Sequence, residues 1–351
     1  MDEGVMGARQ VSCGMTDLHP YSRLTPDVVL NAIESTGLRC DGRLLALNSY
    51  ENRVYQVGIE DADGAASLVV AKFYRPERWS DAQILEEHAF ARELADAEIP
   101  IVAPSEFGGR TLLQAEGFRL AVFPRRGGRA PELEDRETLE WLGRFIGRMH
   151  AVGRVRPFAH RPTIDIASFG EEPRDFLLAS GLIPPELDEP WRQAARLALE
   201  GVWHCYARAG KVGALRLHGD CHAGNVLWTP STGNSVGGPH FVDLDDARMG
   251  PAVQDLWMLI SGDRATMGRQ LGRILAGYED FTEFDDRELH LVEALRTLRL
   301  LHYSAWLARR WDDPAFPINF PFFGTARYWQ DRVLELREQI AAMQEPPLVP
   351  L

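Results

Sequence analysis

The sequence lacks the features that mark membrane, secreted and zinc-stapled proteins. Its 351 residues contain four cysteines, Cys13, Cys40, Cys205 and Cys221, which are widely scattered and never form a CxxC pair. This spacing is typical of reduced thiols and argues against a disulfide framework or a cysteine zinc site. No apolar run approaches the roughly 20 residues that cross a bilayer, and the first residues have no apolar signal-peptide core. We therefore expect a cytoplasmic protein with no membrane partner.

Positive charge is also in short supply. Lys and Arg number 38 against 51 Asp and Glu, which gives a formal net charge of -13. A net negative surface argues against non-specific binding of nucleic acid, so we expect no nucleic-acid partner. The remaining composition, 45% hydrophobic and 25% charged, is that of an ordinary globular protein. The length allows one large core or two smaller ones.

Two regions of different periodicity follow one another along the chain. Residues 1–17 carry no periodicity and are expected to be a flexible extension. Residues 18–124 are rich in strand patterns: RVYQVGIE and ASLVVAKFY flank DADG, which is typical of a β-hairpin. The following SDAQILEEHAFARELADAE predicts a helix that begins with a Ser80–Gln83 capping box. Residues 125–351 are mainly helical, with short strands at GALRL, NVLW and HFVDL. The sequence predicts a monomeric α+β protein with a β-rich N-lobe (18–124) and a larger, α-rich C-lobe (125–351).

The stretch RLHGDCHAGNVLW gathers polar side chains between two glycines directly after an apolar run. Asp220 and Asn225 lie five residues apart in it, and Asp243 follows at the end of a second apolar run, FVD. Three oxygen-bearing side chains are thereby expected at one cleft, and carboxylate and amide oxygens suit Mg²⁺. An Asp that does not bind the metal can take the proton of a hydroxyl during phosphoryl transfer. We assign Asp220 as that base, and Asn225 and Asp243 to the metal.

A zinc site and a hydrolase site are the alternatives for this stretch. His218 and His222 are four apart, as in a helical zinc pair, but the intervening glycine predicts a loop and no HExxH pattern is present. No GxSxG elbow supports a hydrolase. For His218 a hydrogen bond to loop backbone is the favoured role. For His222 that role and an approach to the transferring phosphate both stay open.

Several neighbouring side chains have a structural interpretation beside the chemical one. Asp245 and Asp246 could assist the metal or bind a cationic substrate, or serve as solvated or turn-stabilising groups. Asp255 is expected to cap backbone amides of the catalytic loop, and His150 to be a satisfied core histidine. Cys221 has no basic neighbour in sequence that would activate its thiol.

Lys72 is the second anchor of the expected site. It lies within LVVAKFY, where an unpaired charge among apolar neighbours would be costly. A lysine at an exposed strand edge is the alternative to one that grips a phosphate. Helical spacing puts Glu87 on the buried face of the next helix and Glu86 on the outer face, so we predict a Lys72–Glu87 ion pair. The preceding loop, LNSYENRVY, should cover the phosphates of a nucleotide, with Ser49 as the contact.

The motifs HGDCHAGN and FVDLDD resemble the HGDxHxxN signature of the aminoglycoside phosphotransferase and choline kinase superfamily, whose fold is protein-kinase-like. More closely, LNSYENRVYQ, KFYRPERW, ILEEH, HRPTI, LRLHGDCHAGN, FVDLDDAR, GPAVQDLWML and DPAFP resemble the bacterial stress response kinase A family. The resemblance runs from about residue 18 to the C-terminus. Two departures are the extension at 1–17 and a longer turn at 229–239.

This resemblance implies a cytoplasmic, ATP- and Mg²⁺-dependent kinase of stress response that phosphorylates Ser or Thr in a protein, or in itself. It implies the roles assigned above: Asp220 as proton acceptor, Asn225 and Asp243 as magnesium ligands, and Ser49 in the nucleotide loop. A small-molecule kinase acting on an aminoglycoside, choline or homoserine shares the superfamily signature. A nucleotide-binding regulator without catalysis is disfavoured, because a binding module needs no proton acceptor. The physiological substrate and the activating signal do not follow from the sequence.

Overall fold

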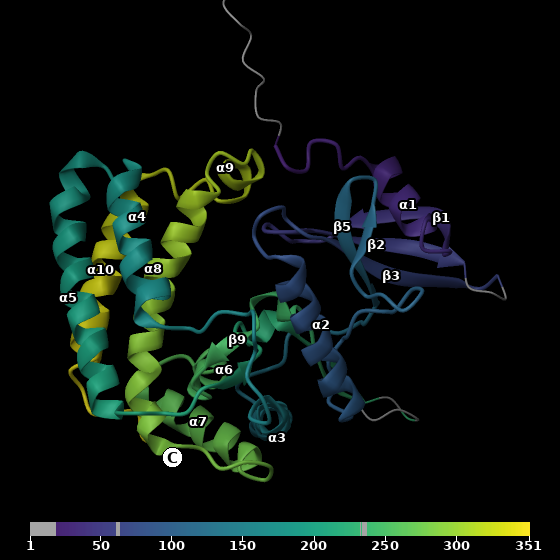
Figure 1. The fold of residues 1–351 in the computed structure, drawn as a ribbon. Helices are drawn as coiled ribbons and strands as arrows, with labels where there is room; N and C mark the ends of the chain where they lie inside the picture. The colour runs from purple at the N-terminus through teal and green to yellow at the C-terminus, as the bar shows by residue number, and fades with distance from the viewer. Residues whose placement is uncertain (1–18, 61–63, 232, 234–236) are drawn as a thin grey trace, which may run out of the picture.

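A computed structural model describes residues 19–60, 64–231, 233 and 237–351 (Figure 1). The extension expected at residues 1–17 lies outside these ranges, and so does part of the turn at 229–239. A sheet-rich part and a helix-rich part lie side by side, with helix α2 (Asp81–Asp96) between them (Figure 1). Within the described ranges, no helix is both long and apolar enough to span a bilayer.

The N-lobe is built on one antiparallel sheet of five strands in the order β1-β2-β3-β5-β4. Its strands are β1 (Arg39–Ala46), β2 (Arg53–Glu60), β3 (Ala66–Phe73), β4 (Leu113–Ala115) and β5 (Phe118–Pro124). Helix α1 (Pro26–Glu34) buries Val29, Ala32 and Ile33 in the same cluster as apolar side chains of the sheet. This burial removes apolar surface from water on one face of the sheet.

The predicted hairpin is confirmed, because β2 pairs with β3 from Arg53↔Phe73 to Glu60↔Ala66. The turn residues 61–63 lie outside the described ranges. Lys72 faces Val54 of β2 on one side and Ala121 of β5 on the other. It therefore lies on a strand held from both edges, not on an exposed strand.

Helix α2 begins with the predicted capping box, in which the Ser80 side chain and Gln83 satisfy each other's backbone. Its buried residues are Ile84, Glu87, His88, Phe90, Ala91 and Leu94. Phe90, Ala91 and Leu94 belong to the large C-lobe core, whereas Ile84 packs with Tyr74 and Ala121 of the N-lobe. The helix thus ties the two lobes together by its apolar stripe.

The C-lobe is mainly helical and contains the larger core of the molecule. Its α-helices are α3 (Arg136–Gly153), α4 (Glu172–Ser180), α5 (Pro185–Ala209), α6 (Val253–Trp257), α7 (Arg264–Tyr278), α8 (Val292–Arg309), α9 (Ala315–Asn319) and α10 (Ala326–Ala342). Short helical turns are η1 (Ala167–Glu171), η2 (Ala223–Asn225), η3 (Leu244–Asp246) and η4 (Asp286–Leu291). Helices α3 and α7 approach so closely that a Cβ at Gly147 would lie 2.5 Å from the Tyr278 carbonyl oxygen.

Two small strand pairs interrupt the helices, as the sequence predicts. Strand β6 (Leu215–Leu217) pairs with β9 (Arg248–Gly250), and β7 (Val226–Thr229) pairs with β8 (Gly238–Phe241). The strand expected over HFVDL ends early, at Phe241, because the backbone turns into the left-handed region at Asp243. The predicted fold class, a sheet-rich N-lobe followed by a helical C-lobe, is confirmed. The division between residues 124 and 125 stays a prediction.

Candidate active site

The loop that follows β6 is held by a buried carboxylate. The two side-chain oxygens of Asp255 accept the backbone N–H groups of His218 and Gly219 at 2.8 and 2.9 Å. Asp255 in turn bonds His150 Nε2 at 3.1 Å, and His150 Nδ1 bonds the Tyr278 hydroxyl at 3.0 Å. The expected structural roles of Asp255 and His150 are confirmed. Together they fix the backbone just before Asp220.

A close backbone crossing explains the glycine before Asp220. Gly219 has φ +84°, and a Cβ there would lie 2.1 Å from the Asp246 carbonyl oxygen. A larger residue would therefore meet both a strained conformation and a clash. His218 Nε2 lies 2.9 Å from the Val242 carbonyl oxygen, which confirms its backbone-bonding role. The His218 ring thus joins the loop to the segment that leads into Asp243.

Asp220 is contacted on both oxygens of its carboxylate. Arg299 Nη1 lies 2.7 Å from Oδ1, and His222 Nε2 lies 3.5 Å from Oδ2. The side-chain amide of Asn225 donates to the Asp220 carbonyl oxygen at 2.9 Å. Burial pushes the pKa of Asp220 upward, but the hydrogen bond with His222 and the charge of Arg299 outweigh it and lower the pKa. The carboxylate is therefore ionised at neutral pH and able to accept a proton. With His218 and His222 turned to different partners, the zinc alternative gains no support.

The β7–β8 hairpin brings Asn225 and Asp243 together. Val226 pairs with Phe241, and the Val242 N–H donates to the Asn225 carbonyl oxygen at 3.0 Å. Asn225 directly precedes β7, and Asp243 lies two residues after the end of β8. Asp243 has φ 62° and ψ 63°, a left-handed conformation that is uncommon outside glycine. This backbone turn presents its carboxylate to the cavity described below instead of continuing the strand.

Lys72 pairs with two carboxylates of the 243–246 segment. Its Nζ lies 2.8 Å from Asp243 Oδ1 and 3.1 Å from Asp245 Oδ1. Burial alone lowers the pKa of Lys72, but the charges of Asp243, Asp245 and Glu87 outweigh it and raise the pKa well above its ordinary value. The prediction of a Lys72–Glu87 ion pair is wrong: Glu87 Oε2 instead accepts from Arg161 Nη2 at 2.8 Å. The prediction fails because the carboxylates of Asp243 and Asp245 lie closer to the Lys72 ammonium than Glu87 does.

The two adjacent glutamates of α2 both hold the 159–161 segment. Glu86 accepts the backbone N–H groups of Ala159, His160 and Arg161, the last two at 2.8 and 2.9 Å. Glu87 binds the side chain of Arg161, and burial raises its pKa to about 7 against the attraction of Lys72 and Arg161. Glu86 is more exposed than Glu87, as predicted, and its carboxylate caps backbone amides of the 159–161 segment.

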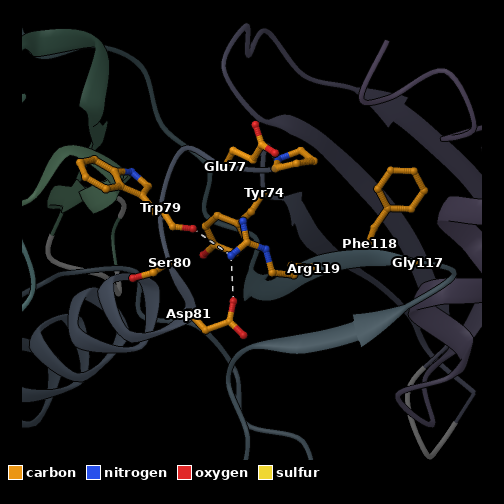
Figure 2. Close-up of a pocket in the computed structure, with 9 residues that line it drawn as sticks. Tyr74, Glu77, Trp79, Ser80, Asp81, Gly117, Phe118 and Arg119 are labelled. Atoms are coloured by element: carbon orange, nitrogen blue, oxygen red, sulfur yellow. Dashed lines mark hydrogen bonds and ion pairs between the residues drawn. The ribbon is translucent and has the colours of Figure 1, made fainter. Parts of the chain in front are cut away.

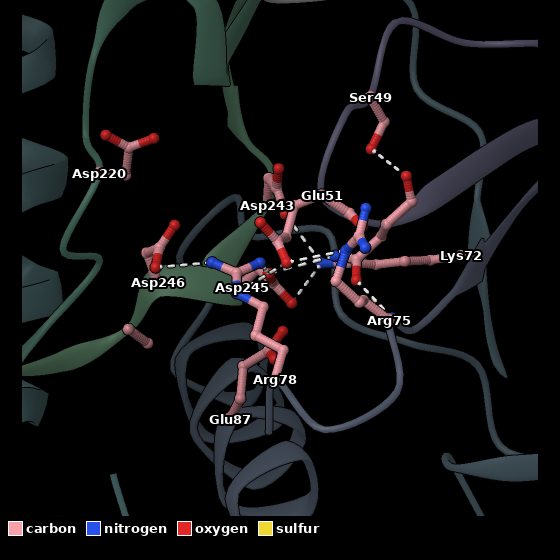
Figure 3. A network of polar contacts seen from close by, with 12 residues as sticks. Ser49, Glu51, Lys72, Arg75, Arg78, Glu87, Asp220, Asp243, Asp245 and Asp246 are labelled. Atoms are coloured by element: carbon pink, nitrogen blue, oxygen red, sulfur yellow. Dashed lines mark hydrogen bonds and ion pairs between the residues drawn. The ribbon is translucent and has the colours of Figure 1, made fainter. Parts of the chain in front are cut away.

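Asp245 and Asp246 are structural charges, paired with arginines. Arg78 binds both of them, reaching Asp246 Oδ1 at 2.9 Å, and Arg248 adds a contact to Asp246 at 3.1 Å. Asp245 is 3% exposed. Figure 3 shows this network between Arg78 and the two carboxylates, with Asp220 standing apart from it. The sequence left these roles open, because Arg78, which binds both carboxylates, lies more than 160 residues away from them in the chain.

The loop before β2 is clasped by both lobes. Ser49 Oγ donates to the Asn52 carbonyl oxygen at 3.1 Å, and Asn52 Nδ2 donates to Asp245 Oδ2 at 3.1 Å. Glu51 binds Arg75 at 3.1 Å and Arg310 at 2.9 Å, although sequence reasoning gave it no role. Its position in the expected phosphate loop was a possible signal. Figure 3 shows Glu51 beside Arg75.

One cavity of about 450 Å³ brings the predicted residues together. It is lined by Ser49, Lys72, Glu87, Asn225 and Asp243, and Asp220 adjoins it through Asn225. Apolar side chains form much of the remaining wall: Leu47, Val54, Val70, Ala91, Val102, Phe123, Leu227, Val242 and Leu244. Residues 125–128, which directly follow β5, also line the cavity.

A second hollow lies on the N-lobe and contains none of the predicted site residues. It measures about 520 Å³ and is lined by residues around Tyr74, Trp79 and Phe118 (Figure 2). Arg119 crosses it to bind Asp81 Oδ1 at 2.8 Å and the Trp79 carbonyl oxygen at 2.9 Å. Of these two hollows, only the 450 Å³ cavity is lined by predicted site residues.

Comparison with known proteins agrees with this geometry. Residues 43–292 match the phosphotransferase enzyme family. The chain is 48% identical to stress response kinase A of Escherichia coli strain K12, over 93% of this chain and 96% of that protein. It is 47% identical, with the same coverage, to the serine/threonine protein kinase RdoA of Salmonella typhimurium strain LT2.

Solved structures show the same fold at low identity. An amicoumacin kinase in complex with AMP-PNP, Ca²⁺ and Ami superposes with a TM-score of 0.67 at 18% identity, covering 93% of this chain and 96% of that chain. A microcompartment-associated aminopropanol kinase superposes with a TM-score of 0.64 at 19% identity, covering 91% and 97%. These similarities concern the fold.

Proposed function

The chain belongs to the phosphotransferase enzyme family and, within it, to the stress response kinase A proteins, and on that premise we propose that it is a protein kinase. It transfers the γ-phosphoryl group of ATP to a serine or threonine hydroxyl of a protein substrate or of itself. The printed name of its Salmonella relative, a serine/threonine protein kinase, favours this acceptor. A monomer acting in the cytoplasm, in a stress response, is part of the same proposal.

The observation that carries this proposal is the convergence of independent predictions on one cavity. Lys72 comes from the N-lobe sheet, whereas Asn225 and Asp243 come from a C-lobe hairpin, and all three line the same 450 Å³ space. A buried lysine charge, two oxygen donors and an adjoining ionised Asp220 are the parts that phosphoryl transfer needs. A protein that only binds a nucleotide would not need Asp220 as a proton acceptor.

The cavity has apolar walls for the base of a nucleotide and charged or polar side chains for its phosphates. Its apolar walls, formed by Val54, Val70 and Phe123 among others, fit a flat heteroaromatic base. Lys72, with its pKa raised, supplies a fixed positive charge for phosphate oxygens. Ser49 lines the same cavity, and Glu87 is among the groups that raise the pKa of Lys72.

The side chains at the cavity also fit a magnesium ion. The Asp243 carboxylate is 54% exposed, and one of its oxygens already lies against Lys72. The Asn225 amide nitrogen is committed to Asp220, which leaves the amide oxygen for a cation. Asn225 and Asp243 would hold Mg²⁺, and the ion would neutralise charge on the phosphate oxygens.

Asp220 performs the proton transfer in the proposed reaction. The acceptor hydroxyl donates its hydrogen to the Asp220 carboxylate, and its oxygen forms a bond to the γ-phosphorus. The bond between that phosphorus and the bridging oxygen of ADP breaks, and ADP leaves with the electron pair. The lowered pKa of Asp220 keeps it ionised before the reaction, so it can receive this proton.

A small-molecule kinase is the second candidate. The solved structures with the same fold include an amicoumacin kinase and an aminopropanol kinase by name. Their low identity to this chain leaves the acceptor open, so the acceptor must be measured.

The test is an acceptor panel with γ-labelled ATP and Mg²⁺. We expect purified protein to label serine or threonine in a generic protein substrate or in itself. Choline, homoserine and an aminoglycoside should not raise ATP consumption above background. Asp220→Asn should lower the labelling rate about 10²–10⁴-fold, the usual worth of a positioned base. Asp175→Asn, at an exposed carboxylate, serves as the matched control.

Two results would overturn the proposal at different levels. Saturable phosphorylation of a small alcohol with no protein labelling would replace the protein kinase by a small-molecule kinase. Near-normal labelling by Asp220→Asn would remove Asp220 from the mechanism.

A further inference from the structure

Arg299 stands at the acceptor side of the site and makes an unusual contact. It lies on α8, and its Nη1 donates to Asp220 Oδ1 at 2.7 Å. The other oxygen of the same carboxylate faces His222 and Asn225, each at 3.5 Å. In the proposed reaction the Asp220 carboxylate must accept a hydrogen bond from the acceptor hydroxyl. Its Oδ1 atom is already bonded to the guanidinium of Arg299. An incoming hydroxyl has to share or replace this contact.

The other arginines of the site are held by carboxylates that take no part in proton transfer. Arg78 binds Asp245 and Asp246, and Arg310 binds Glu51. For Arg299, across the ranges that the structure describes, the ion pair found is the one with Asp220. Its side chain is 40% exposed. When Asp220 turns to an acceptor hydroxyl, the charge of Arg299 loses much of its compensation.

The surroundings of Arg299 offer room for more than a hydroxyl. Arg299 and Tyr303 of α8 line a hollow of about 480 Å³ together with Trp257 of α6. Its other charged side chains are Arg296 of α8 and Glu335 and Glu338 of α10, so Arg299 is the positive charge of this hollow that also contacts Asp220. Tyr303 also lines a neighbouring hollow of about 350 Å³ that reaches Phe322. Two hollows that share one side chain form a surface between α8 and α10, which suits an extended chain better than one compact alcohol.

We propose that Arg299 is a specificity residue that selects acceptors with a carboxylate close to the reacting hydroxyl. The substrate class is a serine- or threonine-containing polypeptide segment with an adjacent Asp or Glu. An acidic neighbour would compensate the guanidinium that the acceptor hydroxyl displaces from Asp220. A cationic acceptor would bring like charges together and is rejected for that reason. This inference rests on the proposed protein kinase function.

The test compares three peptides that share one serine and differ in the two flanking residues: aspartate, alanine or lysine. With the wild-type protein we expect kcat/KM for the aspartate peptide to exceed that for the lysine peptide by about tenfold or more, the scale of one charge-assisted hydrogen bond. Arg299→Gln should bring this ratio close to one, and Arg299→Glu should invert it. Arg309→Gln, on the same helix but with its guanidinium over the Phe176 ring at 4.8 Å, should keep the wild-type ratio.

The outcomes separate this inference from the proposed function. Equal use of the three peptides by the wild type would overturn the inference while leaving the kinase standing, and so would an unchanged ratio in Arg299→Gln. If the wild type phosphorylates choline and none of the peptides, both fail. The wild-type comparison needs no variant, so misfolding of Arg299→Glu cannot rescue the inference.

Discussion

Lys72 shows what a single side chain contributes to this site. Lys72 and Lys211 are the only lysines in a sequence otherwise rich in arginine. The buried position at 72 holds a compact ammonium between Asp243 and Asp245, where a planar guanidinium has a different shape and donor geometry. An arginine-rich chain that keeps lysine here indicates a requirement for a point charge.

We predict that Lys72→Met lowers kcat/KM for ATP by about 10²–10³-fold, because a fixed charge at the phosphates is lost. Lys72→Arg should be impaired as well, since the larger fork does not fit between the same carboxylates. Lys211→Met, at an exposed position, is the control and should match the wild type. Steady-state kinetics with varied ATP give the answer. Wild-type kinetics in Lys72→Met would remove the cavity from the reaction.

Asp245 should make stability depend on pH in a defined direction. Burial alone raises the pKa of Asp245, but Arg78 and Lys72 outweigh it and lower the pKa to about 2, from an ordinary value of 3.8. The folded state therefore favours the ionised form. The resulting stabilisation is present above pH 3.8 and disappears as the pH falls toward 2.

We expect Asp245→Asn to lower the free energy of unfolding by about 3 kcal/mol at pH 7, because Arg78 and Lys72 lose a buried partner. Urea unfolding of both proteins between pH 7 and pH 3 should show this difference shrinking at the acid end. A difference that is constant over the range would contradict the assigned ion pairs.

The residues of the site divide into those that local pattern predicts and those that it does not. Asp220, Asn225 and Asp243 lie in short stretches whose spacing indicates their chemistry. The partner of Lys72 was misassigned to Glu87, fifteen positions along the chain, because periodicity reaches no further than neighbouring elements. The observed partner, Asp243, is 171 residues away in the chain and comes close to Lys72 only in the folded protein. Arg299 was missed for the same reason.

At the scale of elements, the contact between α3 and α7 supports the catalytic loop. Gly147 lets the two helices approach, and one turn later His150 bonds Tyr278 of α7 and Asp255. Asp255 then holds the amides just before Asp220. Helix packing and the position of Asp220, the proposed base, are thus connected through two hydrogen-bonded side chains.

Gly147→Ala should disturb this connection. Its Cβ would lie 2.5 Å from the Tyr278 carbonyl oxygen, so the helices must separate. We expect a loss of about 1–3 kcal/mol in unfolding free energy, typical of overpacking, together with reduced turnover. Gly213→Ala is the control, since a Cβ at Gly213 meets nothing within 4 Å. Urea unfolding and labelled-ATP turnover measure the two effects. Turnover equal to that of Gly213→Ala would show that the packing does not reach the loop.

Elements with local signals were predicted well, and their ends less so. The capping box of α2 depends on Ser80 and Gln83 alone, three residues apart, and is found as expected. The end of β8 depends on a backbone turn at Asp243 that its own apolar run, HFVDL, does not announce. The contacts made around this turn come from distant parts of the chain: Lys72 of β3 binds Asp243, and His218 bonds the Val242 carbonyl oxygen.

For the whole molecule, charges in the cleft join the two lobes. Glu51 of the N-lobe is 9% exposed and binds Arg310 beyond α8, and Trp306 Nε1 donates to its other oxygen. Arg75 of the N-lobe binds Asp313 before α9. The two lobes were predicted from periodicity, but the net charge of -13 gave no hint of arginines gathered between them.

We predict that the wild-type protein unfolds in one calorimetric transition and that Glu51→Ala broadens or splits it. Removing one partner of a buried ion pair costs about 3–5 kcal/mol, here at the contact that couples the lobes. Glu60→Ala is the matched control, because its partner Arg39 is 77% exposed and surface pairs contribute little. A single sharp transition in Glu51→Ala, unshifted from the control, would show that the lobes are coupled elsewhere.

The contacts of Glu51 with Arg310 and Trp306 also affect how long a product stays bound. The loop that covers the proposed phosphate site is pinned to the far lobe by Arg310 and Trp306. Tyr50 of the same loop packs edge-on against Phe320, with ring centroids 4.7 Å apart. If ADP leaves the proposed site past this loop, these contacts must open first, so we predict that release of the product, and not the chemical step, limits the rate of repeated turnover. Because part of these contacts is electrostatic, dissolved salt should shorten the time that ADP stays bound.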